Sequence, residues 1–429
     1  MRAAFYTLGC KVNQYETQIM EQSFSRNGFD IVSCDDIADV YVVNSCTVTG
    51  MSDKKTKQLL RKLRRKNPSS IIALTGCFPQ AFPEQSASLY EADIIMGSAN
   101  RGELVENVKK VIGGEDRIID ISPHKNDEKF EKMKIERFSG RTRAFLKIED
   151  GCDRFCSYCI IPFARGRVRS KSIADIIKEI EELSNNGYEE VVLVGINLSS
   201  YGKDIGLRLI DAVNAACSVE KIKRVRLGSL EPELLTDEDI KAMSKLEKLC
   251  PQFHLSLQSG CDKTLSDMHR HYDCNEYMKI VNNLRAYFEN CSITTDVMVG
   301  FPGETEEDFN KSLDFVMKVG FAKVHVFAYS KRKGTKAAEI PNQIDQVTKE
   351  RRSNYMIQKT NESRLNFLKS QVGKIEEVLF ETRKGYKFEG FTKNYTPVLA
   401  FCEDDITNNV LNVYIEDVKD DYCIGRIIK

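Results

Sequence analysis

The sequence has little proline, no excess of either charge and no long apolar run, and each shortage excludes a class of protein. Only 10 prolines and 25 glycines occur among 429 residues, so neither a collagen-like repeat nor bulk disorder is expected. Lys and Arg total 63, as do Asp and Glu, so a polyanionic partner would have to meet a local basic patch. No stretch approaches the roughly 18 apolar residues of a membrane span, and the opening lacks the apolar core of a signal peptide. We therefore expect a globular cytoplasmic protein with no membrane partner.

Cysteine is present in quantity, with 14 residues, whereas histidine is scarce, with five. Because cytosolic thiols are kept reduced, the cysteines are interpreted as metal ligands or buried thiols rather than as disulfides. None of the histidines has the setting of a metal ligand. His124 lies in a charged segment, and His269 and His271 flank Arg270 on a helix that we expect to be exposed.

Residues 1–115 alternate short β-branched runs with helical stretches, which predicts a parallel sheet. A cysteine comes within two residues of the end of three predicted strands, at 3–8, 40–44 and 71–75. The carboxyl ends of parallel strands share one edge of a sheet, so we expect these thiols to meet in space. They are Cys10, Cys46 and Cys77.

The remainder divides into a polar, charged linker at 116–138, a second series of strands and helices at 139–370, and a tail at 371–429. The second series has six predicted strands, which suggests a partial (βα)6 barrel whose functional groups lie at the carboxyl ends of the strands. Those strands are 144–148, 191–195, 224–230, 253–258, 293–299 and 323–330. The tail has five short strand-like runs, which suits a small all-β barrel of the oligonucleotide-binding kind. The expected fold class is thus α/β with a terminal all-β barrel.

The strongest local motif is GCDRFCSYC at residues 151–159, directly after the first strand of the barrel series. Its cysteines, Cys152, Cys156 and Cys159, have the spacing C-x3-C-x2-C. Three thiolates on one loop can bind three irons of a 4Fe–4S cluster and leave the fourth iron open for a cofactor. A zinc site without a nearby fourth ligand and a chance group of buried thiols are the alternatives. Position and spacing together favour the cluster.

This spacing resembles that of the radical S-adenosylmethionine superfamily, in which the aromatic residue before the last cysteine, here Tyr158, lies near the adenine of the cofactor. Other motifs resemble the methylthiotransferases of that superfamily, over nearly the whole chain. They are GCKVNQYE at 9–16, CIIPFARGRVRS at 159–170, GINLSSYG at 195–202, LGSLEP at 227–232, LSLQSGCD at 255–262, GFPGE at 300–304, VHVFAYS at 324–330 and GFTKNYTPV at 390–398. The last resembles the family's terminal RNA-binding (TRAM-like) barrel. The triplet KVN at 11–13 is similar to the branch that acts on threonylcarbamoyladenosine in tRNA, and other branches carry a different triplet there.

The resemblance implies two 4Fe–4S clusters and S-adenosylmethionine as cofactors. Cys10, Cys46 and Cys77 would bind the second cluster, although a single cysteine is more often a small buried hydrophobe. Candidate cofactor contacts at strand ends are Tyr158, Gly195, Asn197, Glu231, Gln258 and Gly300, where a glycine turn or a solvated side chain is the alternative. The other cysteines share no spacing and are interpreted as structural, with Cys261 placed so that it could approach the site: Cys34, Cys217, Cys250, Cys261, Cys274, Cys291, Cys402 and Cys423.

The implied activity is methylthiolation of carbon 2 of N6-threonylcarbamoyladenosine at position 37 of tRNA. No protein side chain can remove the hydrogen on that carbon as a proton at neutral pH, so a cofactor has to supply radical chemistry. Alternatives are isopentenyladenosine in tRNA or a ribosomal-protein aspartate as the substrate, or a non-catalytic iron–sulfur RNA-binding protein. A cobalamin-dependent radical enzyme would need a cobalt-binding histidine in its first domain, and none precedes His124.

The implied partners are tRNA, through its anticodon stem-loop, and an electron donor such as flavodoxin or ferredoxin, but not DNA. Residues 54–66 hold eight basic side chains, and Arg165, Arg167, Arg169 and Lys171 are expected to contact phosphate near the radical site. Lys11, Asn13 and Arg165 or Arg167 are candidates for pairing with the polar threonylcarbamoyl group. Candidate RNA contacts in the tail, which has 8 basic and 11 acidic residues over 372–429, are Arg383, Lys384, Lys387, Lys393, Tyr386, Phe388 and Tyr395.

Overall fold

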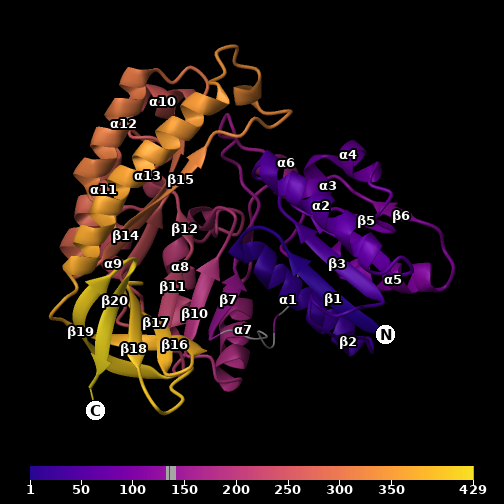
Figure 1. Cartoon of the computed structure of the whole chain (residues 1–429), viewed down its shortest axis with the longest axis horizontal. Coiled ribbons are helices and arrows are strands. Elements are labelled where there is room, and N and C mark those ends of the chain that lie inside the picture. The colour runs from indigo at the N-terminus through magenta and orange to yellow at the C-terminus, as the bar shows by residue number, and fades with distance from the viewer. Residues whose placement is uncertain (132–134, 136–141, 429) are drawn as a thin grey trace.

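The computed structural model describes residues 1–131, 135 and 142–428. The chain forms an N-terminal parallel sheet, an open barrel and a closed β-barrel, in that order (Figure 1). No helix among the described residues is long and apolar enough to cross a membrane. The expected fold class is confirmed.

The N-terminal sheet has the strand order β2-β1-β3-β4-β5-β6, and all its pairs are parallel. Alternate side chains of β3 point to opposite faces: Val40 and Val42 pack with α1 and α5, and Tyr41 and Val43 pack with α2. The order reverses at β1, and ligands of such sheets bind at the carboxyl ends of the strands near this reversal. The elements are β1 (Arg2–Thr7), α1 (Lys11–Arg26), β2 (Asp30–Ile31), β3 (Val40–Ser45), α2 (Gly50–Lys66), β4 (Ile71–Gly76), α3 (Cys77–Ala81), α4 (Pro83–Ala87), β5 (Ile94–Met96), α5 (Leu104–Ile112) and β6 (Ile118–Asp120).

The predicted linker begins with β6, which pairs with β5. Further along, the His124 ring is buried, and its Nε2 lies 2.8 Å from Ser98 Oγ. The buried Ile135 donates its N–H to Glu179 Oε1 at 3.0 Å. This stretch therefore packs between the sheet and the barrel. Residues 132–134 and 136–141, which include the rest of the predicted linker, lie outside the described part, as does residue 429.

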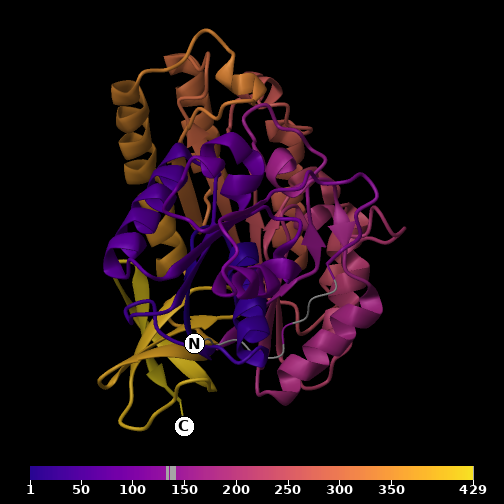
Figure 2. The ribbon, with the colours of Figure 1, turned by 90° about the vertical axis from the view of Figure 1, so that its right-hand side faces the viewer.

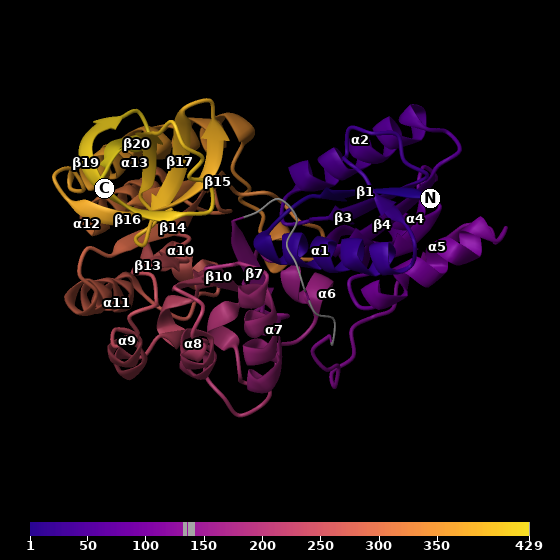
Figure 3. The same ribbon diagram turned by 90° about the horizontal axis from the view of Figure 1, so that it is seen from below.

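The central part is an open barrel of parallel strands, β7-β10-β11 in one sheet and β12-β13-β14-β15 in the other. β11 and β12 together form one predicted strand, so all six predicted strands are present. Helices α7, α8, α9, α11 and α12 cover the outside of the strands, and their apolar faces build the largest core of the molecule (Figure 3). The bounds are β7 (Arg143–Lys147), α7 (Ile173–Asn185), β10 (Glu190–Val194), α8 (Leu209–Ser218), β11 (Arg224–Leu227), β12 (Ser229–Leu230), α9 (Asp237–Met243), β13 (Gln252–Leu255), α10 (Asp262–Asp267), α11 (Cys274–Tyr287), β14 (Ser292–Val299), α12 (Glu306–Val319) and β15 (Lys323–Ala328).

The tail is a closed barrel of strand order β16-β17-β18-β20-β19, and it follows the long helix α13 (Gln346–Lys369). It docks on the open barrel through two buried arginines. Arg224 donates to Glu377 O at 2.8 Å, and Arg226 donates to Lys393 O at 3.0 Å. Its strands are β16 (Ile375–Lys384), β17 (Lys387–Thr392), β18 (Pro397–Phe401), β19 (Val410–Lys419) and β20 (Tyr422–Ile427).

The N-terminal part lies across the opening of the central barrel (Figure 2). At one edge α1 packs beside β7, with Val12 and Tyr15 in the barrel's core. At the other edge, Gly50 N–H donates to Ser330 Oγ at 3.0 Å, and Arg332 donates to Asp53 at 2.7 Å. The carboxyl ends of both sets of strands are thereby brought to one junction.

Candidate site of two cysteine triads

Cys10, Cys46 and Cys77 follow three neighbouring parallel strands, as expected. Cys10 directly precedes α1, Cys46 follows β3, and Cys77 begins α3. Burial raises the pKa of Cys77 to about 12, with Cys46 and Cys10 close enough to add to the rise. The structure therefore brings the three thiols of this first triad together at the reversal of the strand order.

Two glycines let the strand ends carrying this triad approach closely. Gly9 has φ +120°, and a β carbon there would come within 2.7 Å of Cys46 Cβ. Gly76 has φ +101°, and a β carbon there would lie 2.6 Å from Ser45 O. Both residues have a backbone conformation that residues other than glycine rarely adopt, and a side chain at either position would clash with its neighbours. Glycine is therefore required at each.

The second triad, Cys152, Cys156 and Cys159, lies on a loop after the short strand β8 (Glu149–Asp150). Backbone hydrogen bonds fix this loop at both ends. Cys152 N–H donates to Gly166 O at 2.9 Å, and Ser157 N–H donates to Met268 O at 3.0 Å. Burial raises the pKa of Cys152 to about 12 and raises that of Cys159 as well. Thiols this well buried need compensation by metal or cation when they are deprotonated.

Polar candidates from neighbouring strands meet the second triad. Asn197 Nδ2 lies 3.7 Å from Cys152 Sγ, and its backbone N–H donates to Glu149 Oε2 at 2.7 Å. The buried Asn197 Oδ1 has no hydrogen-bond partner among the described residues. Tyr158 packs in an apolar cluster with Phe301 and Tyr329, which lie after β14 and β15. The loop thus has an aromatic side and a polar side, and the polar side retains a free acceptor.

Three of the predicted cofactor contacts, Gly195, Gly300 and Gln258, also have close neighbours within the protein. A β carbon at Gly195 would lie 2.5 Å from Glu149 Oε2, and one at Gly300 would lie 2.4 Å from Lys349 Cγ of α13. Gln258 has φ +65° and donates its N–H to Asp296 O at 2.9 Å. Close packing therefore favours glycine at positions 195 and 300, and their contact with a cofactor stays a prediction.

Arg270 is the residue of this site that sequence reasoning missed. His269 and His271 are exposed, as expected, but they do not lie on a helix, because α10 ends at Asp267, and the side chain of Arg270 between them is buried. Its Nη1 donates to Cys156 Sγ at 3.3 Å, and its guanidinium pairs with Glu231. No local pattern in the sequence indicates these contacts, because Cys156 is 114 residues away. Glu231 is therefore held by Arg270.

Comparison with known proteins agrees with this arrangement. The model of the radical SAM superfamily matches residues 146–316, and that of uncharacterized protein family UPF0004 matches residues 2–97. The chain is 38% identical to threonylcarbamoyladenosine tRNA methylthiotransferase MtaB of Thermotoga maritima, over 91% of this chain and 88% of that protein. It is 35% identical to tRNA-2-methylthio-N(6)-dimethylallyladenosine synthase of Caldicellulosiruptor saccharolyticus, over 98% of this chain and 91% of that protein.

The chain belongs to the radical S-adenosylmethionine methylthiotransferase family. It is a transferase, and membership implies a 4Fe–4S cluster and S-adenosylmethionine as cofactors. The fold is also similar to that of the methyltransferase TsrM from Kitasatospora setae, solved with cobalamin and a [4Fe-4S] cluster bound. That likeness has a TM-score of 0.58 at 12% identity, over 79% of this chain and 74% of TsrM, and concerns the fold alone.

Among the described residues of the methylthiotransferase, no three His, Cys, Asp or Glu side chains are grouped as ligands of a single metal ion. A 4Fe–4S cluster does not require such a group, because each of its thiolates binds a different iron. The donor set of each triad, three thiols at neighbouring strand ends in the first and on one loop in the second, fits a cluster with one open iron.

The basic segment after the second triad corrects another expectation. Arg165, Arg169 and Lys171 are buried, so they cannot contact phosphate, and only Arg167 is exposed. These side chains are buried because the segment passes through the junction between the domains, where acidic side chains neutralise their charges. Lys171 pairs with Glu179, and Arg169 lies 3.3 Å from Asp150.

Asn13 of the KVN triplet also has a structural role in the methylthiotransferase. Its Nδ2 donates to Leu8 O at 2.9 Å and to Ser45 O at 3.0 Å, which joins the loops that carry Cys10 and Cys46. Its Oδ1 accepts from Arg165 at 2.8 Å. Asn13 and Arg165 are therefore unavailable to a substrate, contrary to expectation.

The terminal barrel offers fewer RNA contacts than its sequence suggested. Phe388 lies in its core, and Tyr395 stacks on Phe391 at 4.5 Å with Arg226 against its ring. Three of the four predicted basic contacts form ion pairs, namely Arg383 with Asp405, Lys384 with Glu389 and Lys393 with Glu377. Of the three predicted aromatic contacts, Tyr386 is the most exposed, at 67%.

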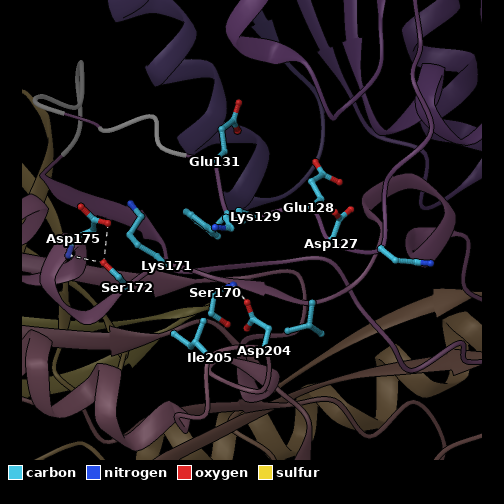
Figure 4. A pocket seen from close by; sticks show the side chains of 13 residues that line it. Asp127, Glu128, Lys129, Glu131, Ser170, Lys171, Ser172, Asp175, Asp204 and Ile205 are labelled. Atoms are coloured by element: carbon cyan, nitrogen blue, oxygen red, sulfur yellow. Dashed lines mark hydrogen bonds between the residues drawn. The ribbon is translucent and has the colours of Figure 1, made fainter.

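A cavity of about 780 Å³ lies apart from both triads, between residues 126–131 and β9 (Arg169–Ser170). Figure 4 shows Asp127, Glu128 and Lys129 facing it from one side, and Ser170 and Asp204 from another. No cysteine is among the described residues that line it. It is a feature of the packed linker.

Proposed function

We propose that this methylthiotransferase modifies carbon 2 of N6-threonylcarbamoyladenosine at position 37 of tRNA. Relatives named for this substrate, 34–38% identical to the chain, support the proposal, alongside relatives 34–36% identical that are named for the dimethylallyl substrate. The observation that carries the proposal is the position of Lys11, a cation beside Cys10 on the side of the junction that faces the open barrel.

Lys11 is the first residue of α1, and its side chain is exposed. Arg143 and Arg226 of the barrel are near enough that their charges act on it, together with that of Glu190. In the described part of the chain Lys11 forms no ion pair, so its ammonium group is available to a ligand. The threonylcarbamoyl group carries a carboxylate, which would pair with this cation, whereas a dimethylallyl group would leave it without a partner.

For the cofactors we infer two 4Fe–4S clusters, one held by Cys152, Cys156 and Cys159 and one by the first triad. When bound, the clusters and S-adenosylmethionine would supply the radical and the methylthio group. The chain's own residues position and shield them: Tyr158 with Phe301 and Tyr329 gives an apolar side that excludes water, and Asn197 Oδ1 offers an acceptor. The first triad is Cys10, Cys46 and Cys77.

For the partners we infer the anticodon stem-loop of tRNA and a low-potential electron donor such as flavodoxin or ferredoxin, in the cytoplasm. The exposed face of α2, with Lys54, Lys55 and Lys62, supports contact with a polyanion. The side chains of Arg64 and Lys66 on the same helix are already used, by Asp93 and by Cys34 O.

An anaerobic reaction that contains both kinds of tRNA tests the substrate. The reconstituted protein is given a reductant, S-adenosylmethionine and equal amounts of threonylcarbamoyl- and isopentenyl-modified tRNA, and mass spectrometry quantifies both methylthio nucleosides. We expect the threonylcarbamoyl product almost alone. Preferential conversion of the isopentenyl nucleoside, or of a ribosomal-protein aspartate, would refute the substrate. Absence of S-adenosylmethionine cleavage would instead favour a non-catalytic iron–sulfur protein.

A further inference from the structure

Arg165 extends from the loop of the second triad to a thiol of the first. It ends α6 (Ile161–Arg165), which begins two residues after Cys159, and its side chain is completely buried. Its Nε donates to Cys77 Sγ at 3.1 Å. One side chain therefore joins the loop of one proposed cluster to a ligand of the other.

The rest of the guanidinium is held by α1, the helix that begins after Cys10. Nη1 lies 2.5 Å from Glu16 Oε1, and Nη2 donates to Glu16 Oε2 at 3.0 Å and to Asn13 Oδ1 at 2.8 Å. All three nitrogens are thus engaged, so the Nε–H cannot turn away from Cys77. Planar, bidentate pairing with a carboxylate requires arginine rather than lysine.

The second triad has a matching arginine on one of its own sulfurs. Arg270 Nη1 donates to Cys156 Sγ at 3.3 Å, while Glu231 pairs with the same guanidinium. In the described structure each triad therefore has one buried cation that donates to one of its thiols.

We propose that Arg165 is a positioning residue that raises the reduction potential of the cluster held by Cys10, Cys46 and Cys77. A hydrogen bond from a cation to a ligating sulfur stabilises the more negative, reduced form of a cluster, and hydrogen bonds to the sulfurs are among the factors that set its potential. Burial strengthens this effect because little water screens it. The proposal rests on the second cluster of the proposed function. It adds that the radical loop tunes that cluster across the junction.

The test uses the full chain with Cys152, Cys156 and Cys159 changed to Ala, so that iron can bind only at the first triad. The midpoint potential of that cluster is measured by redox titration followed by electron paramagnetic resonance. In this background, Arg165→Gln should shift the midpoint to a more negative value, and Arg165→Lys should shift it less because lysine keeps the charge.

The matched control is Arg169→Gln, which removes a buried cation from the same network. Arg169 donates to Arg165 O at 2.9 Å and has no sulfur contact in the described structure, so the midpoint should move less than with Arg165→Gln. Arg270→Gln should leave it unchanged. If Arg165→Gln binds full iron and its midpoint potential is unchanged, the proposal is overturned. Loss of iron from both Arg165 variants would overturn it as well, because Arg165 would then have a purely structural role. If the triple Cys→Ala chain with Arg165 intact binds no iron, the result would instead contradict the presence of a cluster at the first triad.

Discussion

At the scale of single residues, Lys11 differs from its neighbours in the motif at 11–16. We propose that Lys11 recognises the substrate, whereas its neighbours hold the fold together. Val12 and Tyr15 are buried in the barrel's core, and Asn13 joins two strand-end loops, whereas the Lys11 side chain is exposed, with Arg143 and Arg226 of the barrel nearby. Under the proposed function, specificity in this region would depend on this one cation, while Val12, Asn13 and Tyr15 hold the segment in place.

Changing Lys11 to Met should lower kcat/KM for threonylcarbamoyl-modified tRNA by roughly 10- to 100-fold, since a hydrogen bond to a charged group contributes about 1.5–3 kcal/mol. Cleavage of S-adenosylmethionine should continue. The comparison variant Lys11→Arg keeps the charge and should retain most of the activity. Equal kcat/KM for Lys11→Met and the parent protein, measured by nucleoside mass spectrometry, would exclude Lys11 from recognition.

Glu21 of α1 makes stability depend on pH. Burial raises the pKa of its carboxyl to about 7. The folded state therefore holds the proton more tightly than the unfolded state, and this contribution to stability is complete below about pH 4.5 and is lost as pH rises through 7. Glu21→Gln should raise the free energy of unfolding by roughly 1–2 kcal/mol at pH 8, with little gain at pH 5. Denaturant unfolding at both values measures this, and an equal effect at the two pH values would contradict it.

At the scale of elements, α2 presents one apolar and one basic face. Leu60 and Leu63 pack under the sheet, while Lys54, Lys55 and Lys62 are exposed. Changing these three lysines to Gln should weaken tRNA binding and reduce the salt slope by roughly 2 to 3, because each phosphate contact contributes a slope of about 0.7 to 0.9. Binding measured at several salt concentrations gives the slope.

The control for the α2 variant changes three exposed lysines on other helices to Gln, which removes the same amount of charge. Lys110, Lys279 and Lys311 are exposed on α5, α11 and α12. If their change to Gln lowers tRNA affinity as much as the change on α2, net charge rather than this helix face is responsible.

At the scale of the whole molecule, the two triads belong to different domains that meet at one junction. Changing Cys10, Cys46 and Cys77 together to Ala should halve the bound iron and stop methylthio transfer, while cleavage of S-adenosylmethionine continues. Changing Cys152, Cys156 and Cys159 should abolish that cleavage and leave the other half of the iron. Iron analysis and product analysis of both variants check this, and full iron in either one would show that the ligands are assigned wrongly.

The terminal barrel is part of the folded core assembly as well as a candidate RNA contact. Deleting residues 372–429 should lower the unfolding temperature as well as tRNA affinity, because Arg224 and Arg226 would lose the carbonyl oxygens that now accept their hydrogen bonds. Calorimetry and tRNA binding of the truncated chain measure the two effects. Unchanged values of both would show that the barrel is an independent appendage.

The sequence by itself determined most of the strands and the two groups of cysteines, although it missed the short strands β2 and β6, the second of which lies in the predicted linker. These features depend on local periodicity and spacing, which chain segments carry without reference to distant partners. The resemblance of motifs spread along the chain likewise indicated the family that the relatives then showed.

Only the tertiary structure decided the state of the charged residues. Arg165 meets Glu16 149 positions away, and Arg270 meets Cys156 114 positions away, so neither contact leaves a local pattern. Burial opposes the charge of Glu16, yet Arg101, Arg165 and Lys147 hold its pKa at about 2. The basic run on α2 is therefore a solvated face, whereas the basic run after Cys159 is part of a buried network. The two differ because another domain brings acidic partners to the second run at the junction.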